Sequence, residues 1–467
     1  MKVKLLMCIV LSTVGMARGG EGIEWPCTGK IKPRLAAEIH ASNWSIGAET
    51  MDRDYTVYEN WKPYLGPLGF KKARIQVGWA KTEKQKGRYD WEWLDKIITD
   101  MVAQGVEPWV CLCYGNSLYS QGGGTLLGAS IPADEEALQA WEKFVKAMVL
   151  RYKDSIDEWE VWNEPNHGKG ATPEAYAHFL IRTAQAVRSV QQDAKILAMS
   201  LAGVDVKYAS QVLQSVATQG KLDLIDEVTY HPYSYNPDAS YAAVEKLRQV
   251  VHACSSRIRL RQGENGAPSE RRKTRALSNH DWTELSQAKW ALRRLLGDLG
   301  RDIPSSYFAI MDMKYPDEMN SKGLLKANDD KTVAYAKPAY HALASLASVF
   351  DDRLSRIAGY KYHATCLESL SLFAYESKDS GKQVVTVWFD AKIPSDSNEK
   401  TPVDFVFEQG DFDNPVYVDL REGRVYDIPS NKWSKEGKKW VFRDIPCYDS
   451  PILIADRNSI SCEALEE

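Results

Sequence analysis

Residues 159–166 read WEVWNEPN, and residues 261–266 read RQGENG. Each run opens with strand-like residues and ends in a turn that carries one carboxylate, Glu164 in the first run and Glu264 in the second. Parallel strands bring their following turns to one edge of the sheet, so residues far apart in the chain become neighbours there. The two runs therefore predict a pair of carboxylates at the ends of two separate strands.

A pair of this kind is what a retaining glycosidase needs. One carboxyl group donates a proton to the leaving oxygen, and the other, ionised, attacks the anomeric carbon. We expect an O-glycosyl hydrolase that cleaves oligo- or polysaccharides by double displacement. A barrel protein that binds carbohydrate without cleaving it is the alternative from another class. That alternative needs one carboxylate replaced, and both are present.

The stretch Trp162-Asn163-Glu164-Pro165 resembles the clan A retaining glycoside hydrolases. The resemblance covers roughly residues 30–350 and implies a (β/α)8 TIM barrel with the acid/base after strand four and the nucleophile after strand seven. It also implies that Glu164 is the acid/base, that Glu264 is the nucleophile, and that Asn163 binds the sugar 2-hydroxyl. Residues 87–91 (GRYDW) and 337–340 (KPAY) resemble glycoside hydrolase family 39 within this clan, with family 5 as the alternative.

Short apolar runs alternate with helical patterns from about residue 33 to 350, which is the repeat of a parallel α/β barrel. The eight expected strands are Leu35–Ala41, Lys72–Val77, Glu107–Cys113, Glu158–Trp162, Lys195–Ser200, Glu227–Tyr230, Ile258–Gln262 and Tyr307–Met311. From Arg353 onward, short Val- and aromatic-rich runs between polar turns predict an antiparallel β-sandwich. We expect a catalytic barrel at residues 21–352 and, at residues 353–467, a sandwich packed rigidly on it, because no flexible linker separates the two.

Working residues of such a barrel lie where strands end, and that rule selects a set of candidates. Arg74, His231 and Tyr233 match positions that the clan uses to keep the nucleophile ionised; the alternatives are an ordinary ion pair for Arg74 and a structural histidine for His231. Glu160 is expected to be an ion-pair partner inside the barrel. The remaining candidates for substrate contact are Asn43, Trp44, Trp79, Tyr114, Asn116, His167, Asn265, Asp312 and Lys314, with Tyr119 and Tyr235 as further sugar platforms.

Two loops bear on the substrate. Residues 115–134 form a long loop with three glycines at 122–124, which would favour an exo enzyme if the loop closes one end of the site. An endo-acting β-glycanase with an open cleft remains the alternative. Residues 270–275 read ERRKTR and follow strand seven, so this basic loop would receive an acidic or sulfated sugar, unless it is simply a solvated loop.

The composition excludes several other classes. The net charge of −4 implies no attraction to nucleic acid or membrane surfaces, and 15 Trp and 23 Tyr suit a carbohydrate binder.

Lys2, Lys4 and the apolar run 5–14 predict a signal peptide over residues 1–20, hence a secreted or periplasmic enzyme, with lipid attachment at Cys8 disfavoured. We expect no metal and no cofactor, since no Cys/His group has zinc spacing.

The seven cysteines that follow the predicted signal are odd in number, so at least one thiol is free in a monomer. Cys111 and Cys113 are expected to be apolar fillers that do not pair, and Cys366 and Cys447 are a candidate disulfide. The particular sugar, its linkage and the oligomeric state are left open by the sequence.

Overall fold

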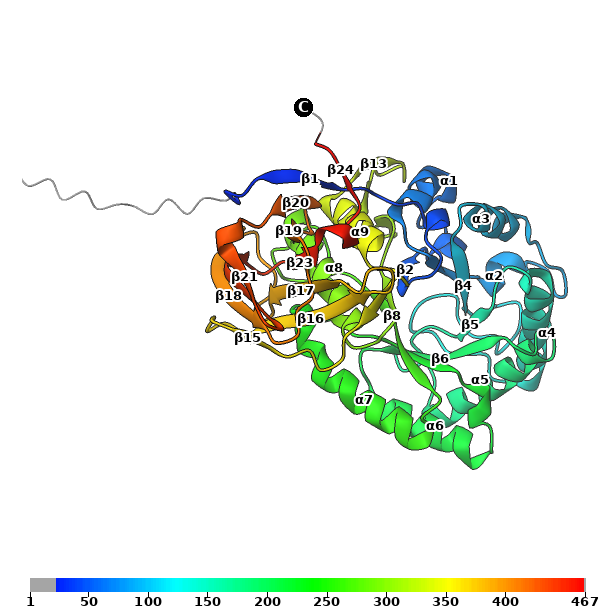
Figure 1. Ribbon diagram of the computed structural model, residues 1–467. Coiled ribbons are helices and arrows are strands. Elements are labelled where there is room, and N and C mark those ends of the chain that lie inside the picture. Colours follow the sequence, from blue (N-terminus) through cyan, green and yellow to red (C-terminus); the bar gives the residue numbers. More distant parts are fainter. Residues whose placement is uncertain (1–21, 466–467) are drawn as a thin grey trace, which may run out of the picture.

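The computed structural model describes residues 22–465, and the predicted signal peptide lies outside this range. A closed parallel barrel occupies the first part of the chain, and two antiparallel sheets form the second part (Figure 1). The barrel strands are β2 Trp44–Gly47, β3 Lys72–Gln76, β4 Glu107–Leu112, β5 Glu158–Val161, β6 Lys195–Ala202, β7 Glu227–His231, β8 Arg259–Asn265 and β9 Ser305–Tyr307. The predicted TIM barrel followed by a sandwich is confirmed.

Helices surround the barrel. They are α1 Tyr58–Trp61, α2 Trp79–Thr82, α3 Glu92–Ala103, α4 Glu135–Tyr152, α5 Pro173–Arg188, α6 Val206–Thr218, α7 Tyr241–Cys254, α8 Glu284–Leu299 and α9 Pro338–Val349. Thr172 caps α5 as its sequence suggests, because its side chain accepts a hydrogen bond from the backbone N–H of Ala175 and Pro173 occupies the first helical position. Within residues 22–465, no helix combines the length and the apolar character that crossing a membrane requires.

Two predicted strands were wrong. Residues 35–41 contain a short 3-10 turn, Ala36–Glu38, and Ala36 and Ile39 are buried, a spacing of three that suits a helical turn. The first barrel strand is β2 instead, and all four of its residues are buried. The last strand, β9, ends at Tyr307, where the predicted strand was expected to begin. In both cases a short strand, buried on both faces, lacks the alternation that marks a half-exposed strand.

The sandwich consists of an eight-stranded and a four-stranded sheet. The larger sheet has the order β14 Leu354–Arg356, β16 Leu370–Ser377, β17 Gln383–Phe389, β23 Ile452–Asp456, β19 Pro415–Asp419, β20 Arg424–Asp427, β1 Cys27–Ile31 and β24 Cys462–Glu463. The smaller sheet has the order β15 Tyr362–Ala364, β18 Thr401–Phe407, β22 Lys439–Cys447 and β21 Trp433–Glu436. Two short hairpins, β10 Met313–Lys314 with β11 Met319–Asn320 and β12 Leu325–Ala327 with β13 Val333–Ala336, lie between β9 and α9.

Strand β1 corrects the predicted domain boundary. It falls within the range assigned to the barrel, yet it pairs with β20 and β24 of the large sandwich sheet. In Figure 1 it is the blue strand that lies along the sandwich beside β20. Backbone pairing with a partner more than 390 residues away leaves no local sign in the sequence.

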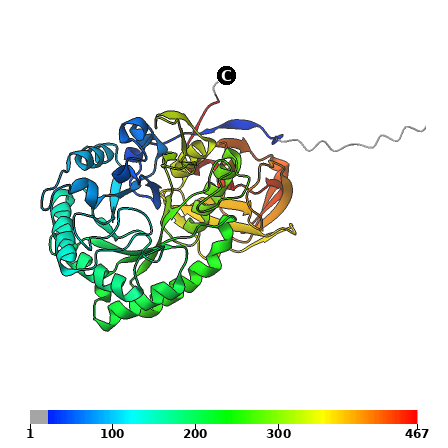
Figure 2. The same cartoon turned by 180° about the vertical axis from the view of Figure 1, so that it is seen from behind.

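The central strands β17, β19 and β23 of the large sheet are buried on both faces. Along β17, Val384 and Trp388 pack into the core that the sheet shares with the barrel, whereas Val385 and Val387 point into the sandwich core. This alternation is the two-residue period of a strand. Figure 2, seen from behind, shows the yellow-to-red sandwich lying directly against one side of the barrel.

The structure records all seven cysteines between residues 22 and 465 as free thiols. The proposed pairing of Cys366 with Cys447 is therefore not formed. Strand β18 lies between β15, which precedes Cys366, and β22, which ends at Cys447. Cys111 and Cys113 are buried and form no disulfide, as expected for apolar fillers, and their sulfur atoms lie 3.5 Å apart.

Candidate active site

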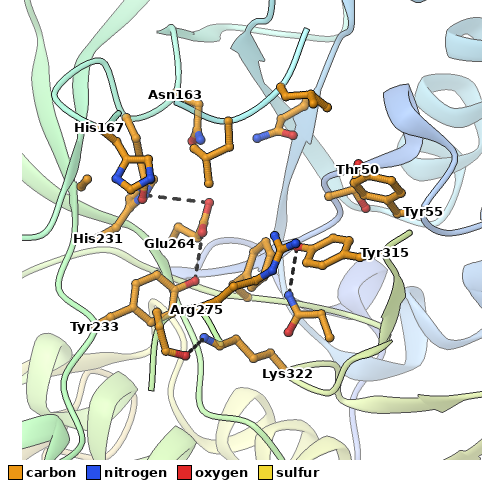
Figure 3. A pocket seen from close by; sticks show the side chains of 18 of the residues that line it. Thr50, Tyr55, Asn163, His167, His231, Tyr233, Glu264, Arg275, Tyr315 and Lys322 are labelled. Carbon is orange, nitrogen blue, oxygen red and sulfur yellow. Dashed lines mark hydrogen bonds and ion pairs between the residues drawn. The ribbon is translucent and has the colours of Figure 1, made fainter. Parts of the chain in front are cut away.

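A cavity of about 750 Å³ opens at the carboxyl ends of the barrel strands. It brings together seven of the predicted site residues: Tyr114, Asn163, Glu164, His167, His231, Tyr233 and Glu264. Figure 3 shows Glu264 near the centre, with Tyr233 and His231 beside it. The candidate pair thus lies at the ends of β5 and β8, which are the fourth and seventh strands of the barrel.

Glu264 is held by a donor on each carboxylate oxygen. Arg74 donates from Nη1 to Oε2 at 2.9 Å, and Tyr233 donates from its hydroxyl to Oε1 at 2.9 Å. Burial alone would raise the pKa of Glu264, but the charges of His231 and Arg74 and the Tyr233 hydrogen bond outweigh burial and hold the pKa below its ordinary value. Glu264 is therefore ionised near neutral pH.

Arg74 lies beneath the cavity and organises its floor. The guanidinium is fully buried and also contacts Glu49 at 3.1 Å, Glu160 at 2.9 Å and Asn163 at 2.8 Å. The contact with Glu160 is the interior ion pair expected for that residue. One cation thus serves three buried carboxylates, and a fixed fork of donors such as guanidinium is suited to this.

Glu164 and its neighbours have an unusual backbone. Trp162 and Glu164 both have positive φ, +67° and +50°, which side-chain-bearing residues rarely adopt. Glu164 Oε1 lies within hydrogen-bonding distance of His231 Nδ1, at 2.9 Å, and His231 Nε2 lies 3.0 Å from Ser200 Oγ. A strained backbone conformation persists only where surrounding contacts hold it in place. At Glu164 the bond to His231 is one such contact, and the side chain lines the cavity.

His231 lies between the two carboxylates. Its Nδ1 is 2.9 Å from Glu164 and 3.9 Å from Glu264. Its closer partner is therefore Glu164, whereas the sequence analysis expected His231 to act on Glu264. Burial lowers the pKa of His231, but the negative charge of Glu264 and the bond to Glu164 outweigh this effect and raise it above the usual value. The environment of His231 therefore favours its protonated form more than water does.

One ligand atom from each of Glu164, His231 and Glu264 lies within 4.8 Å of the others. This spacing would suit a metal ion, but both oxygens of Glu264 already accept hydrogen bonds from Arg74 and Tyr233. The donor set therefore fits proton transfer better than metal binding. The same distance places a carboxylate oxygen of Glu164 within 4.8 Å of one of Glu264.

Other predicted contacts lie outside the cavity. Trp44 is the first residue of β2, and its indole donates to Phe350 O at 2.7 Å, away from the cavity. It was predicted to contact substrate because the first strand had been placed before it. Trp79 is fully buried and stacks on Tyr119, and Asn116 is buried and donates to Glu83 O. Five further candidates do not line the cavity. Four of them have side-chain partners outside it: Asn265, Asp312, Lys314 and Tyr235. The fifth is Asn43.

The cavity also contains residues that the sequence reasoning missed. They are Thr50, Arg53, Tyr55, Gln76, Ala202, Gly203, Ala276, Phe308, Tyr315, Pro316, Asp317, Asn320 and Lys322, together with Leu126 and Leu127, which belong to the predicted loop 115–134 but were not named individually. Residues 50–55 follow β2, so a correct first strand would have pointed to them. Arg272 and Arg275 come from the basic loop and do reach the cavity, but both pair with Glu318.

Lys322 differs from these arginines. It is almost fully buried, donates to Ala276 O at 2.8 Å and lies 4.3 Å from the Tyr233 ring centroid. Burial, reinforced by Arg272, lowers the pKa of Lys322 well below its usual value, although Glu264 and Glu164 oppose this shift.

Comparison with known proteins agrees with this geometry. Residues 64–260 match the model for glycosyl hydrolases family 39. A family 39 glycoside hydrolase from Bacteroides cellulosilyticus WH2 is similar in structure, with a TM-score of 0.66 and 19% identity over 91% of this chain and 83% of that one. A monomeric beta-xylosidase from Caulobacter crescentus CB15 gives 0.58 and 16% over 91% and 97%, and a family 30 subfamily 8 xylanase from Clostridium acetobutylicum gives 0.59 and 12% over 92% and 97%.

The expected resemblance to clan A and to family 39 is confirmed by these matches, and the chain is a glycoside hydrolase. The family match ends at residue 260, before Glu264. The position of the second carboxylate is therefore supplied by the fold and by its contacts with Arg74 and Tyr233.

Proposed function

We propose that this glycoside hydrolase, with its family 39 match, is a retaining β-glycosidase in which Glu264 is the nucleophile and Glu164 the acid/base. One observation carries the proposal: Glu264 is buried between Arg74 and Tyr233, with an oxygen within 4.8 Å of one of Glu164. Retaining enzymes keep their carboxyl groups about 5–5.5 Å apart, whereas inverting enzymes need about 6.5–9.5 Å for a water molecule.

The reaction follows from this arrangement. An oxygen of Glu264 forms a bond to the anomeric carbon while the bond to the leaving oxygen breaks and Glu164 gives that oxygen its proton. Glu164 then takes a proton from water, the water oxygen attacks the anomeric carbon, and the ester bond to Glu264 breaks. Arg74 and Tyr233 stabilise the Glu264 carboxylate before attack and after release.

A 2-fluoro glycoside inactivator tests the assignment. A sugar with fluorine at position 2 slows hydrolysis of the ester, so the peptide that contains Glu264 should gain the mass of one sugar. Label on any other peptide, or a first product of inverted configuration by NMR, would contradict the proposal. The sugar is found first with 4-nitrophenyl glycosides, beginning with the β-D-xyloside because one structural neighbour is a beta-xylosidase. Uronides belong in the panel because Arg272 and Arg275 of the basic loop line the cavity.

We propose exo action. Leu126 and Leu127 of the loop 115–134 line the cavity, so this loop narrows the site on one side. Digestion of a xylo-oligosaccharide should release monosaccharide from the first minutes, whereas early products of intermediate length would favour the endo-acting alternative.

We also propose export to the periplasm or medium, on the basis of Lys2, Lys4 and the apolar run 5–14. A mature N-terminus near residue 21 in the secreted fraction is the expected observation.

A further inference from the structure

The substrate cavity has two chemically different halves. Loops after β8, β9 and β2 supply four basic side chains, Arg53, Arg272, Arg275 and Lys322, and the acidic Asp317. Loops after β4, β5 and β6 supply Leu126, Leu127, His167, Ala202 and Gly203. In this second half, Glu164 is the only Asp, Glu, Lys or Arg among the described residues that line the cavity. Figure 3 shows His167 and Lys322 on opposite sides of Glu264.

The two leucines are exposed at the rim of the second half. Leu126 is 54% and Leu127 is 44% exposed, so neither is part of the protein core. Single exposed leucines are ordinary, but an adjacent pair that lines a catalytic cavity offers an apolar surface to whatever enters it.

The loop that carries these leucines is fixed to the loop of the acid/base. Lys169 N donates to Gly128 O at 2.8 Å. Gly128 has φ of +76°, and a Cβ there would come within 3.1 Å of His167, while one on Gly168 would come within 2.7 Å of Gly128 O. Glycine on both loops thus permits a close approach that holds the leucines beside the strand of Glu164.

The stereochemistry of the proposed reaction decides what the leucines face. The nucleophile attacks one side of the anomeric carbon and the leaving group departs from the other. Glu264 comes from β8, and Glu164, which protonates the leaving oxygen, comes from β5. The leaving group therefore lies in the half of the cavity that Leu126 and Leu127 line.

We propose that Leu126 and Leu127 form a leaving-group subsite for an apolar aglycone, such as an aryl or alkyl group. The inference rests on the proposed function and adds the substrate class to it. A sugar in this subsite would present hydroxyl groups to two side chains that offer no hydrogen bond in exchange for water. An aryl or alkyl group would instead bury its surface against both.

The test compares two substrates of the same sugar with and without an aglycone. The sugar is that of the 4-nitrophenyl glycoside which the full chain hydrolyses fastest, and the partner substrate is its glycosyl fluoride. Combining Leu126→Ser with Leu127→Ser should lower kcat/KM for the nitrophenyl glycoside about tenfold or more, since even one methylene in an apolar pocket is worth about tenfold. Hydrolysis of the fluoride should be unchanged. The KM of alkyl glycosides should fall from methyl to hexyl in the wild type and not in the double variant.

Leu118→Ser is the matched control, because Leu118 is on the same loop, is 38% exposed and does not line the cavity. It should leave both substrates unaffected. Two results for the double variant would overturn the subsite but not the proposed function. One is an equal loss of kcat/KM on the nitrophenyl glycoside and the fluoride; the other is an unchanged kcat/KM for the nitrophenyl glycoside while the fluoride is still hydrolysed. Failure of the wild type to hydrolyse any fluoride or nitrophenyl glycoside would overturn the proposed function, and this inference with it.

Discussion

Replacing Tyr233 with Phe should move the acidic limb of the pH–rate profile. The Tyr233 hydroxyl donates to Glu264 Oε1 at 2.9 Å, and this bond is one of the contacts that hold the pKa of Glu264 down. Tyr233→Phe removes the donor but keeps the ring that Lys322 contacts. The pKa of Glu264 should therefore rise, and activity at low pH should be lost at a higher pH than in the wild type.

The size of the shift follows from the strength of the bond. A hydrogen bond to a charged acceptor contributes about 1.5–3 kcal/mol. The lower end applies here because Glu264 lines an open cavity, where water replaces part of the lost donor. Since one pKa unit corresponds to about 1.4 kcal/mol, the acidic limb should move upward by about one unit.

The assay is kcat/KM for a 4-nitrophenyl glycoside across the pH range, because this parameter reports the free enzyme. Tyr315→Phe is the control, since Tyr315 lines the same cavity and its hydroxyl accepts from Asn320 and donates to Met313 Sδ, not to a carboxylate. An acidic limb that stays in place in Tyr233→Phe would refute either the assignment of that limb to Glu264 or the hydrogen bond itself.

Three further predictions address the acid/base, the buried floor and the sandwich. Glu164→Ala should abolish hydrolysis of glycosides with poor leaving groups, spare dinitrophenyl glycosides and respond to azide; equal losses on both substrates without azide rescue would contradict its role. Burial, opposed by Arg74 and reinforced by Glu264, raises the pKa of Glu49 to about 7, so its contribution to stability is full below about 4.5 and is lost as the pH rises through 7. Glu49→Gln should therefore gain in melting temperature relative to wild type between about pH 5 and pH 8, and a constant difference would argue against the shift. A chain truncated after Asp352 should be insoluble or much less stable, because β1 then lacks the strands it pairs with and buried Lys289 lacks Asp449. A soluble barrel that melts like the full chain would refute this.

The sequence predicted the parts of the site that local patterns encode. A carboxylate in a turn after a strand is visible in WNEP and in RQGENG, and the barrel rule then places both turns at one edge. Helices such as α5 were equally readable, because a cap, a proline and an apolar stripe act within a few residues.

The errors arose where burial erases the local pattern. Strand β2 is four residues long and buried on both faces, so the more apolar segment before it was chosen, and Trp44 was assigned to the wrong end of the barrel. The loop at residues 50–55 was missed for the same reason. Trp79 looked like a sugar platform by position, but it packs behind the site on Tyr119.

The sequence by itself determined the fold class, the pair of glutamates and the glycosidase chemistry that they imply, because each depends on short-range order and on one rule of barrel topology. Only the tertiary structure decided that one buried arginine serves Glu49, Glu160 and Glu264, and that His231 lies closer to Glu164 than to Glu264. Only it decided that β1 completes the sandwich and that leucines line the half of the cavity opposite the basic side chains. These contacts join residues tens to hundreds of positions apart, and their geometry is set by side-chain packing that spacing along the chain does not encode.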